Sequence, residues 1–237
     1  MRAIVLEEVE LTSAGEKLEV LGQSALHLIK VVRIKIAEKV LVLNGRGLKI
    51  LTEVSNLDKK KLELTVVECQ KIERESTLDL FLAPPKKEAF EDILRNSCEL
   101  GIAKIHLVES AYSQFKNPNS ERCQRILIGA MEQSNNCYKP LFDSGLTTFA
   151  NSLTLLEAYQ QVFYFSPNGE NSLQLEDKAG KYALFIGPEA GLTENEETSL
   201  KDLKNSVTIR LPSPILRAPT AVSAATGFLM GHGLKIF

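Results

Sequence analysis

The chain has 237 residues, of which 44% are hydrophobic and 24% are charged, so it has the composition of a globular protein that can bury one large core or two modest ones. The formal net charge of −2 excludes a chain that is basic throughout, as many nucleic-acid-binding proteins are. No apolar run reaches the roughly 18 residues that a transmembrane helix needs.

The N-terminal residues, the cysteines and the histidines indicate where the protein is found in the cell and whether it binds a metal. The first residues, Met1 to Glu8, include acids where a signal peptide needs a long apolar stretch, so we expect a cytoplasmic protein. The four cysteines form no C-x-x-C pair, which argues against disulfides and zinc. The three histidines are too widely spaced to form a ligand set, so we expect no metal site.

Residues 1–73 have the pattern of a small β-rich domain. Asn44-Gly45 is a strong signal for a hairpin between two apolar segments. The segment Leu62–Val66 alternates apolar and polar residues, as a half-buried strand does. The strands predicted here are Ala3–Leu6, Val40–Leu43, Leu48–Val54 and Leu62–Val66.

One helix is predicted within this domain, from Ala25 to Lys35. Its apolar residues recur at i, i+3, i+4 and i+7, which gives the helix a single apolar stripe. His27, Lys30 and Arg33 lie on a different face, in a region where cations outnumber acids. That face is either simply solvated or contacts the phosphates of RNA, and the pattern leaves both readings open.

Residues 74–237 alternate short apolar strands with helices. Such alternation predicts an α/β fold with a parallel sheet and helices on both of its faces. A charged run from Lys71 to Ser76 is the expected linker between the two domains. The predicted strands are Leu78–Ala83, Ile105–Val108, Gln161–Phe165, Tyr182–Ile186 and Val207–Ile209, and the predicted helices are Lys87–Gly101, Ser120–Ser134, Glu194–Leu203 and Leu216–Gly231.

A glycine-containing loop, Gly187–Gly191, follows the strand Tyr182–Ile186 and precedes a helix. Thr193 and Glu196 have the spacing of a capping box, which supports a helix start there. In open α/β sheets, ligands bind outside the carboxyl ends of the strands, where such loops lie. Spacing alone favours an ordinary strand-to-helix turn, because short loops with glycine and proline are common in every fold.

A second loop, from Leu211 to Ala221, is rich in proline and apolar residues. Its prolines fix the backbone, and Leu211, Ile215 and Leu216 offer apolar contact. No Walker loop, G-x-S-x-G elbow or G-x-G-x-x-G fingerprint occurs in the chain. The two loops together favour a pocket that holds an adenine-containing ligand through backbone groups, although rigid packing would explain the prolines as well.

Taken in order, several segments resemble one family, the RsmE family of 16S ribosomal RNA uracil-N3 methyltransferases in the SPOUT superfamily. The segments are His27–Arg33, Glu99–Gly101, Glu132–Ser134, Ile186–Gly191 and Ile215–Ala221. The resemblance implies a PUA-like β-barrel domain at residues 1–73 and a SPOUT methyltransferase domain with a trefoil knot at residues 74–237. It also implies a homodimer that uses S-adenosyl-L-methionine and acts on 16S ribosomal RNA within the small ribosomal subunit.

The resemblance also indicates which residues would carry the chemistry. Arg217 is the candidate catalytic residue, because a cation beside the uracil oxygens would stabilise the anion that develops there. The expected RNA contacts are Arg2, His27, Lys30 and Arg33. The expected cofactor contacts are Phe165, Ile186, Gly187, Glu189, Gly191, Leu211, Pro212, Ile215, Leu216 and Ala221.

Several residues that the family usually carries, most of them charged, are replaced in this chain. Ser110-Ala111 stands where the family has Glu-Arg, and the other replacements are Asn96 for Lys, Asn136 for Arg, Ala190 for Gly and Pro219 for Glu. The apolar pocket positions are largely kept. An RNA-binding protein of the same fold, with lost or altered methyl transfer, is therefore the alternative reading.

Overall fold

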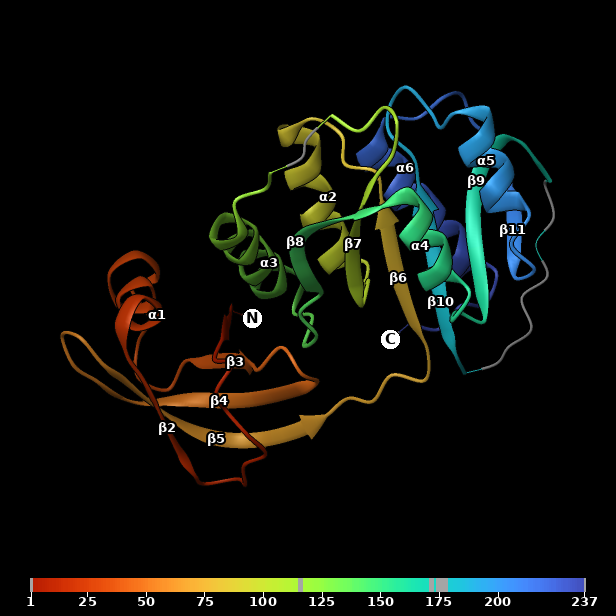
Figure 1. Ribbon diagram of the computed structural model, residues 1–237. Helices are drawn as coiled ribbons and strands as arrows, with labels where there is room; N and C mark the ends of the chain where they lie inside the picture. Colours follow the sequence, from red (N-terminus) through yellow and green to blue (C-terminus); the bar gives the residue numbers. More distant parts are fainter. Residues whose placement is uncertain (1, 115–116, 171–172, 174–178, 237) are drawn as a thin grey trace. The chain divides into compact units, whose positions relative to one another are not determined.

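The computed structural model describes residues 2–114, 117–170, 173 and 179–236 (Figure 1). The contacts between residues divide the chain into two compact units. The first combines Met1–Glu73 with Ile128–Lys139, and the second combines Arg74–Leu127 with Pro140–Phe237. Helix α3 (Ser120–Ser134) therefore begins in the second unit and ends in the first.

The first unit is built on a five-stranded sheet in the order β1-β3-β4-β5-β2. Neighbouring strands are antiparallel except for β1 and β3, which are parallel. Alternate residues of β4 and β5 are buried, in agreement with the alternation predicted from sequence. The strands are β1 (Arg2–Val5), β2 (Lys17–Val20), β3 (Lys39–Leu43), β4 (Leu48–Leu57) and β5 (Leu62–Lys71).

The helix of the first unit differs from the prediction in length and type. It begins as α1 (Gly22–Leu26), continues as a π-helix η1 (His27–Val32), and ends at Arg33, which has a left-handed φ of 55°. The expected extension to Lys35 is wrong, because this left-handed residue turns the chain out of the helix. The apolar stripe is confirmed, since Ala25 and Leu28 are buried in the core of the unit.

The segment 128–139 completes the first unit through hydrogen bonds that are distant in sequence. The Val5 N–H donates to the Glu132 carboxylate at 3.2 Å, and the Gly47 N–H donates to the Cys137 carbonyl at 3.0 Å. The Tyr138 hydroxyl donates to the Ile72 carbonyl at 2.6 Å. These bonds give partners from residues 128–139 to one backbone group of β1 and to two backbone groups beside the ends of β4 and β5.

The second unit contains a six-stranded sheet in the order β11-β9-β10-β6-β7-β8. Every neighbouring pair is parallel, which confirms the predicted parallel sheet. Strand β8 was not predicted from sequence, since polar residues and a glycine interrupt its apolar residues and none of its residues is buried. The strands are β6 (Thr77–Leu82), β7 (Lys104–Glu109), β8 (Leu141–Thr148), β9 (Gln161–Glu170), β10 (Lys181–Ile186) and β11 (Ser206–Ile209).

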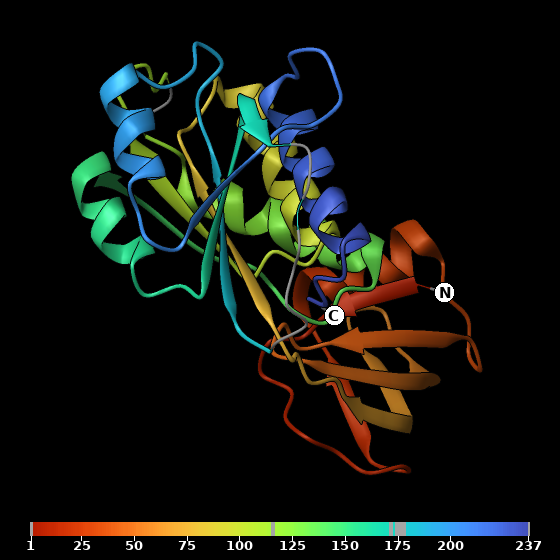
Figure 2. The same cartoon turned by 90° about the vertical axis from the view of Figure 1, so that its right-hand side faces the viewer.

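Helices cover both faces of this sheet (Figure 2). On one face, α4 (Phe149–Leu156) and α5 (Glu194–Lys201) enclose a core that includes Phe81 and Phe185. On the other face, α6 (Ala218–Gly231) packs against β10 and against α2 (Lys87–Glu99). The last helix begins at Ala218 rather than Leu216, with proline in its first turn, where the missing N–H costs least.

Candidate functional site

The loop that follows β10 leaves the carboxyl edge of the second sheet at a buried residue, Ile186. The Gly191 N–H donates to the Pro188 carbonyl at 2.9 Å, which closes a turn. Gly191 has a φ of +79°, a conformation that other residues rarely adopt, and a Cβ placed there would meet nothing within 4 Å. Glu189, Ala190 and Gly191 are exposed, so this turn is open to a ligand.

The start of α5 is fixed by the capping box predicted from sequence. The Thr193 hydroxyl accepts the Glu196 N–H at 3.3 Å, and the Glu196 carboxylate accepts the Thr193 N–H at 2.9 Å. The other carboxylate oxygen of Glu196 accepts the Ala111 N–H at 2.9 Å, in the turn after β7. Sequence reasoning missed this second contact, because no local pattern links two residues that lie 85 positions apart.

The proline-rich segment leaves the same edge of the sheet after β11. Since β11, β9 and β10 are consecutive parallel strands spaced about 5 Å apart, the segment and the Gly187–Gly191 loop begin within about 10 Å of each other. Pro212 and Ile215 are exposed, and the exposed fraction of Ile215 is 94%. Leu211 and Leu216 are half-buried. The segment thus presents apolar side chains that the rest of the chain covers only in part.

Arg217 occupies the N-cap position of α6 in an extended conformation, and its side chain is exposed. Its carbonyl accepts the Ala221 N–H at 2.8 Å, while the guanidinium has no ion-pair partner among the residues that the structure describes. Arg210, directly after β11, is a second exposed cation at this edge, and sequence reasoning did not single it out. Its position one residue beyond a strand was the available signal.

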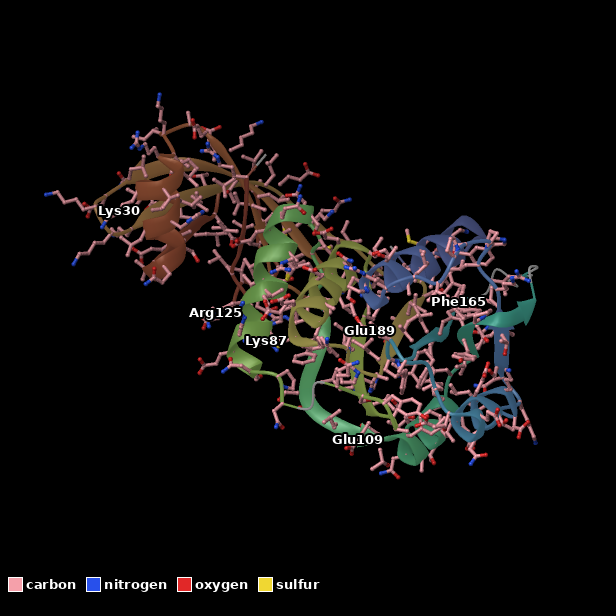
Figure 3. All side chains as sticks on the ribbon, turned by 90° about the horizontal axis from the view of Figure 1, so that it is seen from above. Lys30, Lys87, Glu109, Arg125, Phe165 and Glu189 are labelled. Carbon is pink, nitrogen blue, oxygen red and sulfur yellow. The ribbon has the colours of Figure 1, made fainter. Side chains whose placement is uncertain are left out.

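Phe165 and Ala221 lie on β9 and α6, which adjoin the two loops in the chain or in the sheet. Phe165 lies in β9 and is half-buried, and its ring packs edge-on against Phe228 of α6 at 5.9 Å between centroids. Ala221 lies in the first turn of α6 and is half-buried. Figure 3 labels Phe165 and Glu189, which come from β9 and from the loop after β10. The ten candidate cofactor residues thus lie on β9, β10, α6 and the connecting loops.

The four candidate RNA contacts, Arg2, His27, Lys30 and Arg33, belong to the first unit and are all exposed. Figure 3 shows the Lys30 side chain on the outside of that unit. The Arg2 guanidinium lies 3.6 Å from the Glu38 carboxylate, an exposed pair that holds the arginine only weakly. The lysine and the two arginines of this set are available to phosphate groups.

Two of the replaced family positions meet in the second unit. The Asn96 side-chain amide of α2 donates to the Ser223 hydroxyl at 3.0 Å and to the Pro219 carbonyl at 3.4 Å. At positions 96 and 219, where the family usually has a lysine and a glutamate, this chain therefore has an uncharged hydrogen bond between α2 and α6. Ser110 is likewise held locally, since its N–H donates to the Ser113 hydroxyl at 3.0 Å. In the first unit, the Asn136 side chain accepts the Tyr138 N–H at 2.9 Å.

The remaining expectations concern metals and membranes. No group of three or more His, Cys, Asp and Glu side chains within the described ranges could hold a metal ion. In the same part of the chain, no helix is both long enough and apolar enough to cross a membrane.

Comparison with known proteins gives two family matches. Residues 73–230 match the model of an RNA methyltransferase domain, and residues 20–67 match that of an RNA methyltransferase PUA domain. Two curated relatives are similar over most of their length. The Rickettsia conorii protein named ribosomal RNA small subunit methyltransferase E is 28% identical over 89% of this chain and 88% of its own. A Borreliella burgdorferi protein, named ribosomal RNA small subunit methyltransferase E 2, is 27% identical over 83% of each chain.

Solved structures share the whole fold. A ribosomal RNA small subunit methyltransferase E from Neisseria gonorrhoeae, bound to S-adenosylmethionine, superimposes with a TM-score of 0.84 at 23% identity, over 98% of this chain and 97% of its own. A Legionella pneumophila structure that also holds this cofactor gives a TM-score of 0.78 at 22% identity, over 98% of each chain. The RNA methyltransferase domain model covers well over half of the residues, and the chain therefore belongs to the RNA methyltransferase family.

Proposed function

We propose that this protein transfers a methyl group from S-adenosyl-L-methionine to N3 of a uridine in the 16S ribosomal RNA of the small subunit. The proposal includes action in the cytoplasm as a homodimer. The family assignment and the names of the relatives support the reaction class. The observation that carries the proposal is the convergence of the Gly187–Gly191 loop and the segment after β11 at one edge of the sheet.

The residues present at this edge fit S-adenosylmethionine. The space beside Gly191 is open, so a ligand can approach the backbone closely. The half-buried side chains of Leu211 and Leu216 and the exposed Ile215 offer apolar contact to an adenosyl or methionyl group. Glu189 is exposed on the same loop and offers a carboxylate to a hydroxyl or ammonium group.

The cofactor supplies an electrophilic methyl group when it is bound. For its part, the chain must orient a uracil for in-line attack by N3 and stabilise the charge that spreads onto the uracil oxygens once the imino proton is lost. Arg217 is suited to that role, since its guanidinium is exposed and offers several N–H donors. Arg2, His27, Lys30 and Arg33 of the first unit would bind RNA phosphates.

The homodimer is supported by α6, which carries small residues along its exposed side. Ala221, Ser223 and Ala224 are only partly covered, and Gly227 is exposed. Small side chains permit two helices to approach closely, and the 94% exposed Ile215 precedes this helix. Sedimentation equilibrium should give twice the chain mass at micromolar concentration, and a monomer at that concentration would contradict the dimer.

The experiment that tests the reaction follows tritium from labelled S-adenosylmethionine into small ribosomal subunits. Wild-type protein should transfer label, and nucleoside analysis should place it on uridine N3. Arg217→Ala should lower the rate about a hundredfold or more, the usual cost of losing one transition-state contact. Lys30→Ala combined with Arg33→Ala should instead weaken RNA binding and flatten its salt dependence. If wild-type protein transfers no label, the protein is an RNA-binding member of the family rather than an enzyme.

A further inference from the structure

The Glu196 side chain joins two loops that leave the sheet from different strands. One carboxylate oxygen accepts the Ala111 N–H at 2.9 Å, in the turn after β7. The other accepts the Thr193 N–H at 2.9 Å, directly after the Gly187–Gly191 loop. Strand β6 lies between β7 and β10, so the two loops are not neighbours in the sheet. The half-buried Glu196 carboxylate therefore links the segments that follow β7 and β10 at the carboxyl edge of the sheet.

Backbone hydrogen bonds also connect the segments after β7 and β10, through the segment that follows β6. The Ala83 N–H, just after β6, donates to the Ile186 carbonyl at 3.0 Å. The Gln114 N–H, after the turn that follows β7, donates to the Pro84 carbonyl at 3.2 Å. The first bond fixes the beginning of the candidate cofactor loop, and the second ties the segment after β6 to the segment after β7. The end of the loop is fixed by Thr193 and, through Glu196, by Ala111.

We propose that Glu196 is a positioning residue that holds the Gly187–Gly191 loop in the conformation that binds S-adenosylmethionine. This inference rests on the function proposed above. A loop anchored at both ends loses little conformational freedom when a ligand binds, so its affinity is higher than that of a free loop. Glu196 acts through the backbone of other residues and does not itself touch the ligand.

The two variants that test this role separate the anchoring of the loop from the capping of α5. Glu196→Gln keeps a residue that suits a capping box, but its amide has one acceptor oxygen, so one of the two N–H groups loses its partner. Thr193→Val removes the hydroxyl that caps the helix, together with the 3.0 Å hydrogen bond that this hydroxyl donates to the Glu196 carboxylate, but it keeps the two backbone N–H donors to that carboxylate, at Thr193 and Ala111. If Glu196 served only the stability of the helix, both variants would behave alike.

The measurements are calorimetric binding of S-adenosylmethionine, thermal unfolding and hydrogen exchange of the Ala111 amide. Glu196→Gln should weaken cofactor binding about tenfold and speed exchange at Ala111, with RNA affinity unchanged. Thr193→Val should lower the melting temperature by a few degrees and keep wild-type cofactor affinity. If the wild-type protein binds the cofactor and Glu196→Gln binds it equally well, the positioning role of Glu196 is contradicted while the proposed function is not. If wild-type protein binds no cofactor, the proposed function fails and this inference fails with it.

Discussion

Gly191 is the residue of the candidate cofactor loop whose backbone tolerates the least change. Its φ of +79° is a severe outlier for a β-branched residue, so Gly191→Val should force the loop into another conformation. A Cβ added at this position would meet no atom of the chain within 4 Å, so the protein should still fold. We expect S-adenosylmethionine to raise the melting temperature of the wild type by mass action and to leave that of Gly191→Val unchanged.

Gly129→Val is the matched control for this prediction. Gly129 lies in α3 and has no left-handed φ, and a Cβ added at this position would likewise meet no neighbour within 4 Å. The cofactor-induced rise in melting temperature should survive this change. An equal rise in wild type and Gly191→Val would show that the loop is not part of the cofactor site.

Tyr164 makes stability depend on pH in the alkaline range. Burial, with the nearby Glu197 carboxylate second, raises the pKa of the Tyr164 phenol to about 12, against a usual value of about 10. Below pH 10 the phenol is neutral in both the folded and the unfolded state. As the pH rises from about 10 to about 12, the unfolded chain releases its proton first, so stability is lost.

Urea unfolding at about pH 8 and about pH 11 tests this prediction. Tyr164→Phe should lose less stability than the wild type between the two pH values, because it lacks one of the groups that titrate differently in the two states. Tyr112, which is 49% exposed, provides the control variant Tyr112→Phe, and its pH dependence should match that of the wild type. An identical loss in all three proteins would mean that Tyr164 ionises as easily in the fold as in the unfolded chain.

At the scale of the element, the π-helix η1 ends on a residue with an unfavourable backbone conformation. Arg33 has a φ of 55°, which a glycine adopts at no steric cost. Arg33→Gly and Arg33→Ala both remove the guanidinium, yet Arg33→Gly should be more stable to denaturant by about 1 kcal/mol, the usual cost of a left-handed residue. Both variants should lose the same RNA affinity. Equal stability of the two variants would mean that the chain leaves the helix in another way.

Elements with a strong apolar period could be predicted from sequence, while partly exposed ones could not. β10 and β6 are apolar and lie in the interior of the sheet, and α2 has a clear apolar face, so their patterns are unambiguous. β8 includes Asp143, Ser144 and Gly145 and has no buried residue, so its pattern resembles a loop. α4 follows β8 directly, and its N-cap residue Thr148 gave too weak a signal alone.

The candidate site shows the same limit. The Gly187–Gly191 loop and the capping box of Thr193 and Glu196 are local in sequence, and the structure contains both. Contacts between distant residues, such as that of Glu196 with Ala111, depend on the order of strands in the sheet. A single sequence does not contain that order in any local pattern, and the trefoil knot that the family resemblance implies stays a prediction for the same reason.

At the scale of the whole molecule, the first compact unit is discontinuous in sequence. It combines Met1–Glu73 with Ile128–Lys139, which follow much of the second unit in sequence. They supply the Glu132 carboxylate to β1 and the Cys137 carbonyl to the loop after β3. Burial raises the pKa of the Glu132 carboxyl, and the Val5 N–H that it accepts opposes this shift. The unit that we propose to bind RNA therefore depends on residues 128–139, which come after residues 74–127 of the other unit.

A fragment of residues 1–73 should consequently fail to fold stably by itself. In the fragment the Val5 and Gly47 N–H groups lose the acceptors that residues 128–139 provide, and the Ile72 carbonyl loses the Tyr138 hydroxyl. We expect its proton NMR spectrum to show the narrow amide dispersion of an unfolded chain. Residues 1–73 joined by a flexible linker to residues 128–139 should recover a dispersed spectrum and a cooperative unfolding transition, because the added segment restores these bonds. If residues 1–73 alone give that dispersed spectrum, the segment 128–139 is an accessory to the sheet and the continuous boundary at residue 73 describes the folding unit.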